Sequence, residues 1–334
     1  MSTKSSAAAF NRDGPVAFSI DDPHQRDWMN AACPCGSTRP AGECHASRRT
    51  KRWKLPQHEP LLTGPPTGQA RSGCYAASTN DCFGKLSKEH WISAGILRSP
   101  TFGDGKRVNI SELFWQQSGA ADVLPVSGLS AKVLCERHNN ALTTLDSTAT
   151  RLHSTVEHFY LAQLREHGSR TSEFDLISGE AIERWMLKLI WGQLAAANEI
   201  PGLLEDRGTR NTLLKYLFRD GRLPKGWGLY FKGIVAEGVR ARSDVGFEAR
   251  VDIRDGQLLT GEVTLAQLTL TFAFGRMEAG NGAFLRYRPS AIRLFSAFDQ
   301  ACNAIALSWD SRREMPAEYV DLRLRGSRPA GPRR

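Results

Sequence analysis

The chain has 334 residues, of which 41% are hydrophobic and 24% charged, and its formal net charge is +9. This length exceeds one average domain and predicts two folded units. No apolar run approaches the roughly 18 to 20 residues that cross a bilayer, and residues 1–10 lack the apolar core of a secretory signal, so we expect a cytoplasmic protein that is neither membrane-bound nor secreted.

The cysteines are the first informative feature. Six of the seven precede residue 136 and fall in tight groups. In a chain of the cytoplasm, clustered thiols indicate metal sites more often than disulfides. The seventh, Cys302, lies in the apolar stretch 301–307 and is expected to be a small buried side chain.

The first candidate metal ligands follow residues 1–30, a polar stretch without a sustained period that we expect to be disordered. Cys33, Cys35, Cys44 and His45 form a C-x-C-x8-C-H pattern, and such a set can close a tetrahedral zinc site. The stretch CPCGSTRPAGECH resembles the SEC-C zinc motif, with a threonine in place of the second glycine of that motif. The resemblance implies a structural zinc knuckle within residues 31–54 that stabilises the chain or docks a partner.

A basic run closes this segment and contains no acidic residue. It consists of Arg48, Arg49, Lys51, Arg52 and Lys54. One interpretation is a salt-sensitive contact with a nucleic-acid backbone, and the other is a solvated surface linker. Residues 55–73 are rich in Pro and Gly, which predicts a linker, and residues 326–334 form a basic tail.

A second set of ligands comes from two distant segments. Cys74 with Cys82, and Cys135 with His138, can together close one structural zinc site that joins the two segments. Between them, Glu89-His90 places a carboxylate beside an imidazole. A His near a divalent ion is suited to deprotonate water, because its pKa lies near neutrality.

These residues resemble the HNH endonuclease family, in particular its branch with flanking zinc-binding thiols. The resemblance covers residues 74–150 and implies a ββα-metal core that holds one divalent ion, Mg²⁺ or another, against a scissile phosphate. By this analogy His90 is the general base and Glu89 orients it or binds the ion. Asn139 would face the metal at the start of a helix. Asp146, seven residues on, would lie on the same helix face.

The sequence departs from the family pattern at three points. Seven residues separate Cys74 from Cys82, a longer spacing than is common in the family. His138 stands where the family usually has a cysteine, a change that zinc accepts. A clear central Asn is missing, since Asn109 is far from Cys135. A core that binds nucleic acid without cutting it is therefore the alternative.

The second half of the chain predicts helices followed by an antiparallel sheet. Apolar residues at helical spacing predict core helices over 145–160 and 180–198. Asp146 has a second interpretation here, as the cap of a helix that begins near Ser147. Residues 229–235, 247–253, 258–265, 268–274 and 292–295 read as strands separated by turn signals. The fold class is therefore α+β, with residues 151–325 as an α+β C-terminal domain.

Two functions fit these patterns. The first is a metal-dependent endonuclease, acting on DNA in a restriction or defence role, with structural Zn²⁺ and a catalytic divalent ion. The second is a non-catalytic zinc module that binds nucleic acid or protein. The Glu89-His90 pair discriminates between them. A third class, with its site in the C-terminal half, has no P-loop, nucleophile elbow or dinucleotide fingerprint to support it.

Overall fold

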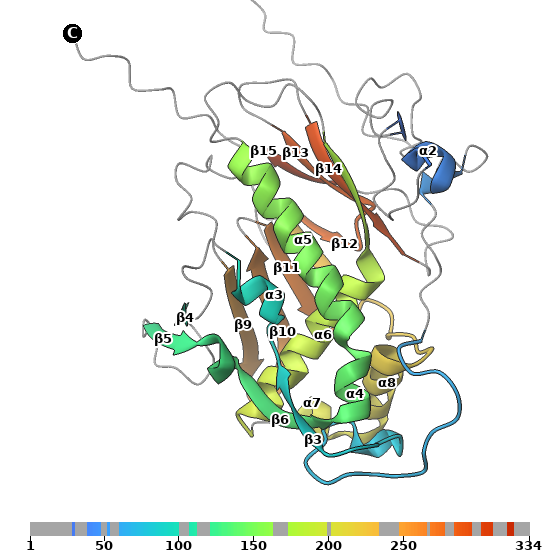
Figure 1. Cartoon of the computed structure of the whole chain (residues 1–334), viewed down its shortest axis with the longest axis vertical. Coiled ribbons are helices and arrows are strands. Elements are labelled where there is room, and N and C mark those ends of the chain that lie inside the picture. The colour runs from blue at the N-terminus through green and yellow to red at the C-terminus, as the bar shows by residue number, and fades with distance from the viewer. Residues whose placement is uncertain are drawn as a thin grey trace, which may run out of the picture.

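The longest helices, α5 (Thr143–Ala162) and α6 (Gly179–Ala196), pack against each other and against both large sheets (Figure 1). Helix α6 begins where the Ser178 side chain accepts a hydrogen bond of 3.1 Å from the Ala181 amide, a favoured cap geometry. Side chains on all of its faces are buried, which makes it the central helix of the core. The computed structural model describes residues 29–30, 39–47, 52–53, 60–99, 107–111, 121–162, 173–198, 202–233, 247–265, 268–277, 284–295, 302–309 and 319–323.

An antiparallel sheet forms one face of the core, as the sequence predicts. In spatial order its strands are β12 (Phe284–Tyr287), β8 (Gly228–Gly233), β11 (Leu268–Ala273), β10 (Gln257–Leu265) and β9 (Phe247–Arg254). Strands β9 and β10 are joined through Asp255 and Gly256, which both have positive φ, as a tight hairpin turn requires. The α+β class is confirmed.

A second sheet is mixed and was not foreseen. Its strands, in spatial order, are β15 (Tyr319–Arg323), β13 (Ala291–Phe295), β14 (Cys302–Ser308) and β7 (Phe174–Ser178). Strand β14 pairs with β13 antiparallel and with β7 parallel. The expected strand at 292–295 therefore belongs to this sheet and not to the antiparallel one. Parallel partners such as β7 and β14 lie far apart in sequence, because a parallel pair needs a long crossover.

Two antiparallel strands and a following helix occupy the segment 74–150. Strand β3 (Leu86–His90) pairs with β6 (Ser130–Cys135), and α4 (Glu136–Ala141) follows β6 directly. The pairing is irregular between Ser87 and Glu89. Shorter elements surround it: η1 (Ala77–Thr79), α3 (Ala94–Leu97), η3 (Val126–Leu129) and the pair β4 (Arg107–Ser111) and β5 (Ala121–Pro125).

The remaining described elements are short, apart from one helix. They are α2 (Ala41–Cys44), β1 (Ala46–Ser47), β2 (Arg52–Trp53), α7 (Gly202–Glu205) and α8 (Arg207–Phe218). Helix α8 is capped by the Asp206 side chain, which accepts a hydrogen bond of 2.7 Å from the Thr209 amide. No helix among the residues described is long and apolar enough to cross a membrane.

One continuous apolar core joins the β3–β6 segment to the C-terminal sheets. It extends from Leu62 to Leu322 and includes Trp91 and Trp185. The close approach of α6 to the end of β3 requires Gly192, where a Cβ atom would lie 2.8 Å from the Cβ of Trp91. This approach places the middle of α6 next to β3.

His153 of α5 is expected to make the fold acid-sensitive. Burial lowers the pKa of His153 below 6.5, and the nearby Glu157 only partly opposes this effect. Below pH 6.5 the unfolded chain then binds more protons than the folded chain. The free energy of unfolding therefore decreases as the pH is lowered, by at most about 1.4 kcal/mol per pH unit. Urea unfolding between about pH 5 and pH 7 should show a shallower fall for His153→Gln than for wild type. Equal pH dependence in the two proteins would contradict this role.

Candidate functional site

The sequence-predicted ligands of the second cysteine group meet at one point. Cys74 and Cys82 flank η1, Cys135 ends β6 and His138 lies in α4. Their ligand atoms all lie within 4.8 Å of one another, and all four residues are buried. The Nδ1 atom of His138 is 3.1 Å from the Sγ atom of Cys135, and 3.8 and 3.9 Å from those of Cys74 and Cys82. Three sulfur donors and one imidazole can bind a metal ion such as zinc.

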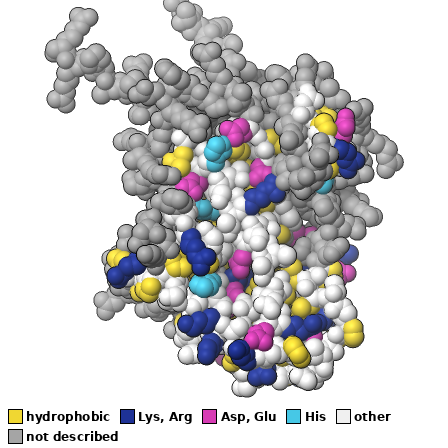
Figure 2. All heavy atoms as spheres, in the orientation of Figure 1, with side chains coloured by type: hydrophobic (Ala, Val, Ile, Leu, Met, Phe, Trp, Pro, Cys, Tyr) yellow, Lys and Arg dark blue, Asp and Glu magenta, His cyan; other side chains and the backbone are white. Residues whose placement is uncertain are grey.

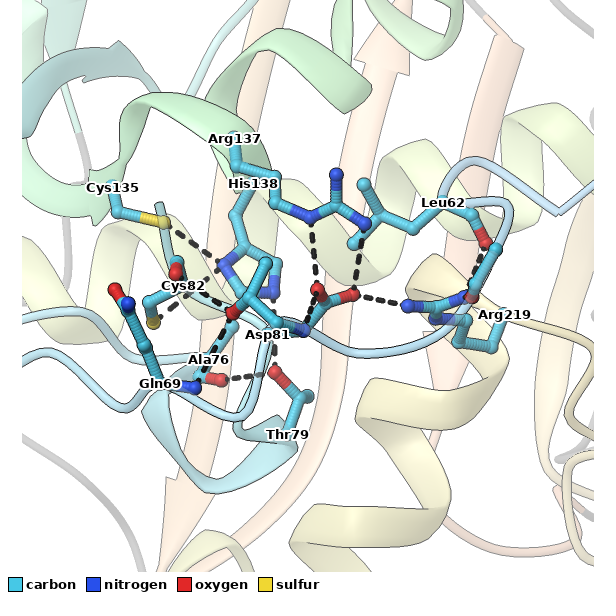
Figure 3. Close-up of polar contacts among 12 residues, drawn as sticks. Leu62, Gln69, Ala76, Thr79, Asp81, Cys82, Cys135, Arg137, His138 and Arg219 are labelled. Atoms are coloured by element: carbon cyan, nitrogen blue, oxygen red, sulfur yellow. Dashed lines mark hydrogen bonds and ion pairs between the residues drawn. The ribbon is translucent and has the colours of Figure 1, made fainter. Parts of the chain in front are cut away.

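Thr79 sets the orientation and tautomer of His138 (Figure 3). The Thr79 hydroxyl donates to the Ala76 carbonyl over 2.7 Å, so its oxygen accepts the Nε2 hydrogen of His138 over 3.2 Å. The Nδ1 lone pair is then directed at the three sulfur atoms. Burial lowers the pKa of His138 to about 4, which keeps the ring neutral at neutral pH. His138 therefore has the neutral donor form that a metal ion requires.

The thiols of the cluster complete this donor set. Burial raises the pKa of Cys74 to about 12, and it also raises the pKa of Cys82. A bound cation stabilises the thiolate and reverses this effect. Metal binding by these residues should therefore release protons.

Thr79→Val is expected to weaken zinc binding about 10- to 100-fold, because the His138 ring loses the group that orients it. The matched control is Thr79→Ser, which keeps the hydroxyl and should retain near wild-type affinity. Competition with a chromophoric zinc chelator measures both affinities. Equal affinities for Val and Ser would show that the hydroxyl does not support the ligand.

An ion-pair network surrounds the cluster. The carboxylate of Asp81 is 1% exposed, accepts a hydrogen bond of 2.9 Å from Arg137 Nε and also pairs with Arg219 (Figure 3). Burial alone would raise the pKa of Asp81, but hydrogen bonds from Arg137, the Thr67 amide and Arg219 outweigh it and lower that pKa. The carboxylate therefore remains charged and keeps both arginines in place.

The same network ties the cluster to the C-terminal half. Arg219 follows α8 and also donates to the Leu62 carbonyl over 2.9 Å. The ring of Phe218, the last residue of α8, packs edge-on against His138 with centroids 4.7 Å apart. Loss of order in the cluster would therefore reach α8.

A pocket of about 620 Å³ is lined by residues that include Asn139, which directly follows the cluster residue His138. Its lining residues come from β3, α3, α4 and α5, and include all four residues that the sequence assigns to catalysis or to the catalytic ion: Glu89, His90, Asn139 and Asp146. His90 is half-buried. Burial, followed by the nearby Lys188 and Arg98, lowers the pKa of His90 below 6.5, so the imidazole is neutral at neutral pH. It can accept a proton there.

Asn139 joins α4 to β3. Its Nδ2 atom donates to the Ser87 hydroxyl over 2.9 Å and to the Lys88 carbonyl over 3.1 Å. Both acceptors immediately precede the Glu89-His90 pair. Asn139 therefore fixes the strand that carries the two side chains, in addition to lining the pocket.

Lys188 of α6 also belongs to the site, although the sequence pattern did not indicate it. Its ammonium group is fully buried and lies 2.6 Å from Glu89 Oε1 and 2.8 Å from Asp146 Oδ1. It also donates to the His90 carbonyl. The available signal was a set of charged residues within an otherwise apolar helix, since Glu183 and Arg184 are buried there as well. A charge on a buried helix needs a partner.

Asp146 and Glu89 differ in their surroundings. Both hydrogen bonds to Asp146, from Lys188 and from the Ser93 hydroxyl, are accepted by Oδ1. The Asp146 side chain is 29% exposed. Glu89 is 4% exposed, and its burial raises its pKa to about 7, although Lys188 opposes the rise. Asp146 is therefore the more accessible of the two carboxylates that line the pocket.

The N-terminal predictions fall largely outside the described residues. Cys33, Cys35, Arg48, Arg49, Lys51 and Lys54 lie there, as do residues 1–28 and the basic tail. Cys44 ends α2 and accepts a contact of 3.8 Å from Arg39, His45 follows it and is buried, and Arg52 lies in β2. The SEC-C-like zinc knuckle and its basic extension therefore stay predictions.

Comparison with family models, curated proteins and solved structures gives no match for this chain.

Proposed function

We propose that the chain is a metal-dependent endonuclease that hydrolyses phosphodiester bonds in DNA at the pocket beside β3. The observation that carries this proposal is the shared pocket of His90, Glu89, Asn139 and Asp146, whose residue Asn139 directly follows His138 of the buried Cys₃His cluster in α4. The HNH-like pattern of the sequence places a base and ion-binding groups at these same positions. The cluster would hold structural zinc and would not take part in the reaction.

His90 is the proposed general base. In this scheme its neutral imidazole takes a proton from water, the resulting hydroxide attacks phosphorus, and the bond from phosphorus to the leaving oxygen breaks. The leaving oxygen then takes up a proton from solvent. Asp146 would hold a divalent ion such as Mg²⁺ through Oδ2, and that ion would polarise the phosphodiester. Asn139 and Lys188 hold the strand and the two carboxylates in place.

The charge around the pocket supports a polyanionic substrate. Figure 2 shows Lys and Arg side chains gathered over the end of the molecule where β3, β6 and α4 lie. Exposed basic residues on or next to β3, α3 and β6 are Lys85, Lys88, Arg98 and Lys132. A phosphate backbone that crosses the pocket would meet these side chains, and its binding would weaken with salt.

Cleavage of supercoiled plasmid by the purified full-length chain tests the proposal. We expect nicked or linear DNA in the presence of Mg²⁺, Mn²⁺ or Ni²⁺, and none with EDTA at a concentration that leaves the structural zinc bound. Single-stranded DNA and RNA are the comparison substrates. Absence of cleavage with every ion and substrate would favour the non-catalytic zinc module, for which salt-dependent binding to the same substrates is the measurement.

A further inference from the structure

Lys188 is the only described residue of the C-terminal half whose charge lies between Glu89 and Asp146. Its ammonium contacts Glu89 from β3, Asp146 from α5 and the main chain of His90, at distances of 2.5 to 2.8 Å. These three partners are 99, 42 and 98 residues away in sequence. Helix α6 therefore supplies the centre of a site whose other groups belong to residues 74–150.

The ammonium makes two hydrogen bonds, to the His90 carbonyl and to Asp146 Oδ1, and an ion pair with Glu89. A lysine ammonium has three donors and no acceptor, and Lys188 has three oxygen atoms within hydrogen-bond distance. Its side chain is fully buried, so the ammonium does not reach a substrate phosphate in the pocket. Lys188 is therefore a positioning residue, which acts on the site through Glu89, Asp146 and the His90 carbonyl.

The Lys188 ammonium also supplies the positive charge that the Glu89 and Asp146 carboxylates require between them. Two carboxylates that face a shared buried point repel each other, and without a cation one of them takes up a proton. A divalent ion could fill this position, as carboxylate pairs commonly bind such ions. Here Lys188 already takes that position. The Trp185 indole donates to the Ser93 hydroxyl, which donates to the same Asp146 oxygen that Lys188 contacts.

We propose that Lys188 is a built-in cation that occupies the position between Glu89 and Asp146, so that the pocket binds at most one divalent ion, through Asp146 and without Glu89. The role of Lys188 in catalysis rests on the proposed function. The number of divalent ions that the pocket binds does not depend on that function. Glu89 serves to hold Lys188 and, through it, the main chain of the base.

Mn²⁺ binding to the full-length, zinc-loaded chain tests the inference independently of DNA cleavage. Electron paramagnetic resonance measures free Mn²⁺ for wild type, Lys188→Met and the double variant Glu89→Gln/Lys188→Met. We expect Lys188→Met to bind Mn²⁺ about tenfold more tightly or better, because both carboxylates then face the ion. The double variant should lose this gain. Near-UV circular dichroism confirms that each variant is folded, and a folded Lys188→Met with wild-type affinity would overturn the inference.

Glu89→Gln in the wild-type background keeps the inference testable if Lys188→Met does not fold. We expect its Mn²⁺ affinity to equal that of wild type, because Glu89 is engaged by Lys188 and is not an ion ligand. A marked loss of affinity would show that Glu89 binds the ion and would overturn the inference. If neither wild type nor any of these variants cuts DNA, the proposed function fails. Their Mn²⁺ affinities still decide whether Lys188 occupies the position between Glu89 and Asp146.

Discussion

Removal of the metal ion from the cluster of Cys74, Cys82, Cys135 and His138 is expected to lower the free energy of unfolding by about 4 kcal/mol at a free zinc concentration 1,000-fold above Kd. Without the ion, four polar groups remain buried within 4.8 Å of one another. Their thiols and imidazole then keep only weak mutual contacts. Cys135→Ser should have a similar effect, because Cys135 is fully buried and makes the shortest contact with His138.

Urea unfolding followed by near-UV circular dichroism, with and without a zinc chelator, measures this effect. The chelator should destabilise wild type strongly and Cys135→Ser hardly at all, because the variant has already lost the ion. His158→Ala is the matched control, since His158 is an exposed residue outside the cluster and its variant should stay sensitive to the chelator. Wild-type stability that is unchanged by the chelator, with all bound zinc removed, would refute a structural role for the metal.

The spacing of the cysteines predicted this cluster from the sequence, although its two halves lie about 60 residues apart. Clustered cysteines together with a histidine are typical metal ligands, so the residue types alone indicate a metal site. Amphipathic and apolar periods predicted α5 and α6 to within two residues at each end. Strands β8, β9, β10 and β11 of the antiparallel sheet were predicted because hairpin turns and β-branched runs are local signals, whereas β12 was not predicted.

Long-range pairing accounts for what the sequence did not predict. Strand β7 is a short apolar run, and its parallel partner β14 follows more than 120 residues later, so no local pattern identifies the pair. The sequence pattern also does not show which charged residues form ion pairs with each other. Lys188 and Arg219 each stand next to apolar residues of a helix, and only the fold brings them to Glu89 and Asp81. Buried charges in a core helix are thus the signal to look for.

His90→Ala is expected to reduce the rate of plasmid cleavage about 10²- to 10⁴-fold, the usual contribution of a general base. Asp146→Asn would also lower the rate, but it would disturb the Lys188 contact as well, so it separates the roles less clearly. His158→Ala is the matched control, because His158 is an exposed residue of α5 that pairs with Glu173 outside the pocket. Its variant should cut at the wild-type rate.

The pH dependence of cleavage distinguishes a base from a residue that only shapes the pocket. The pKa of His90 is lowered below 6.5, so the neutral form dominates at and above pH 6.5. For wild type, kcat/KM should rise with pH below 6.5 and level off above it, whereas the residual rate of His90→Ala should lack this rise. Zinc content and near-UV circular dichroism must match in the two proteins. A variant that cuts as fast as wild type, or that keeps the same rise with pH, would place the base elsewhere in the pocket.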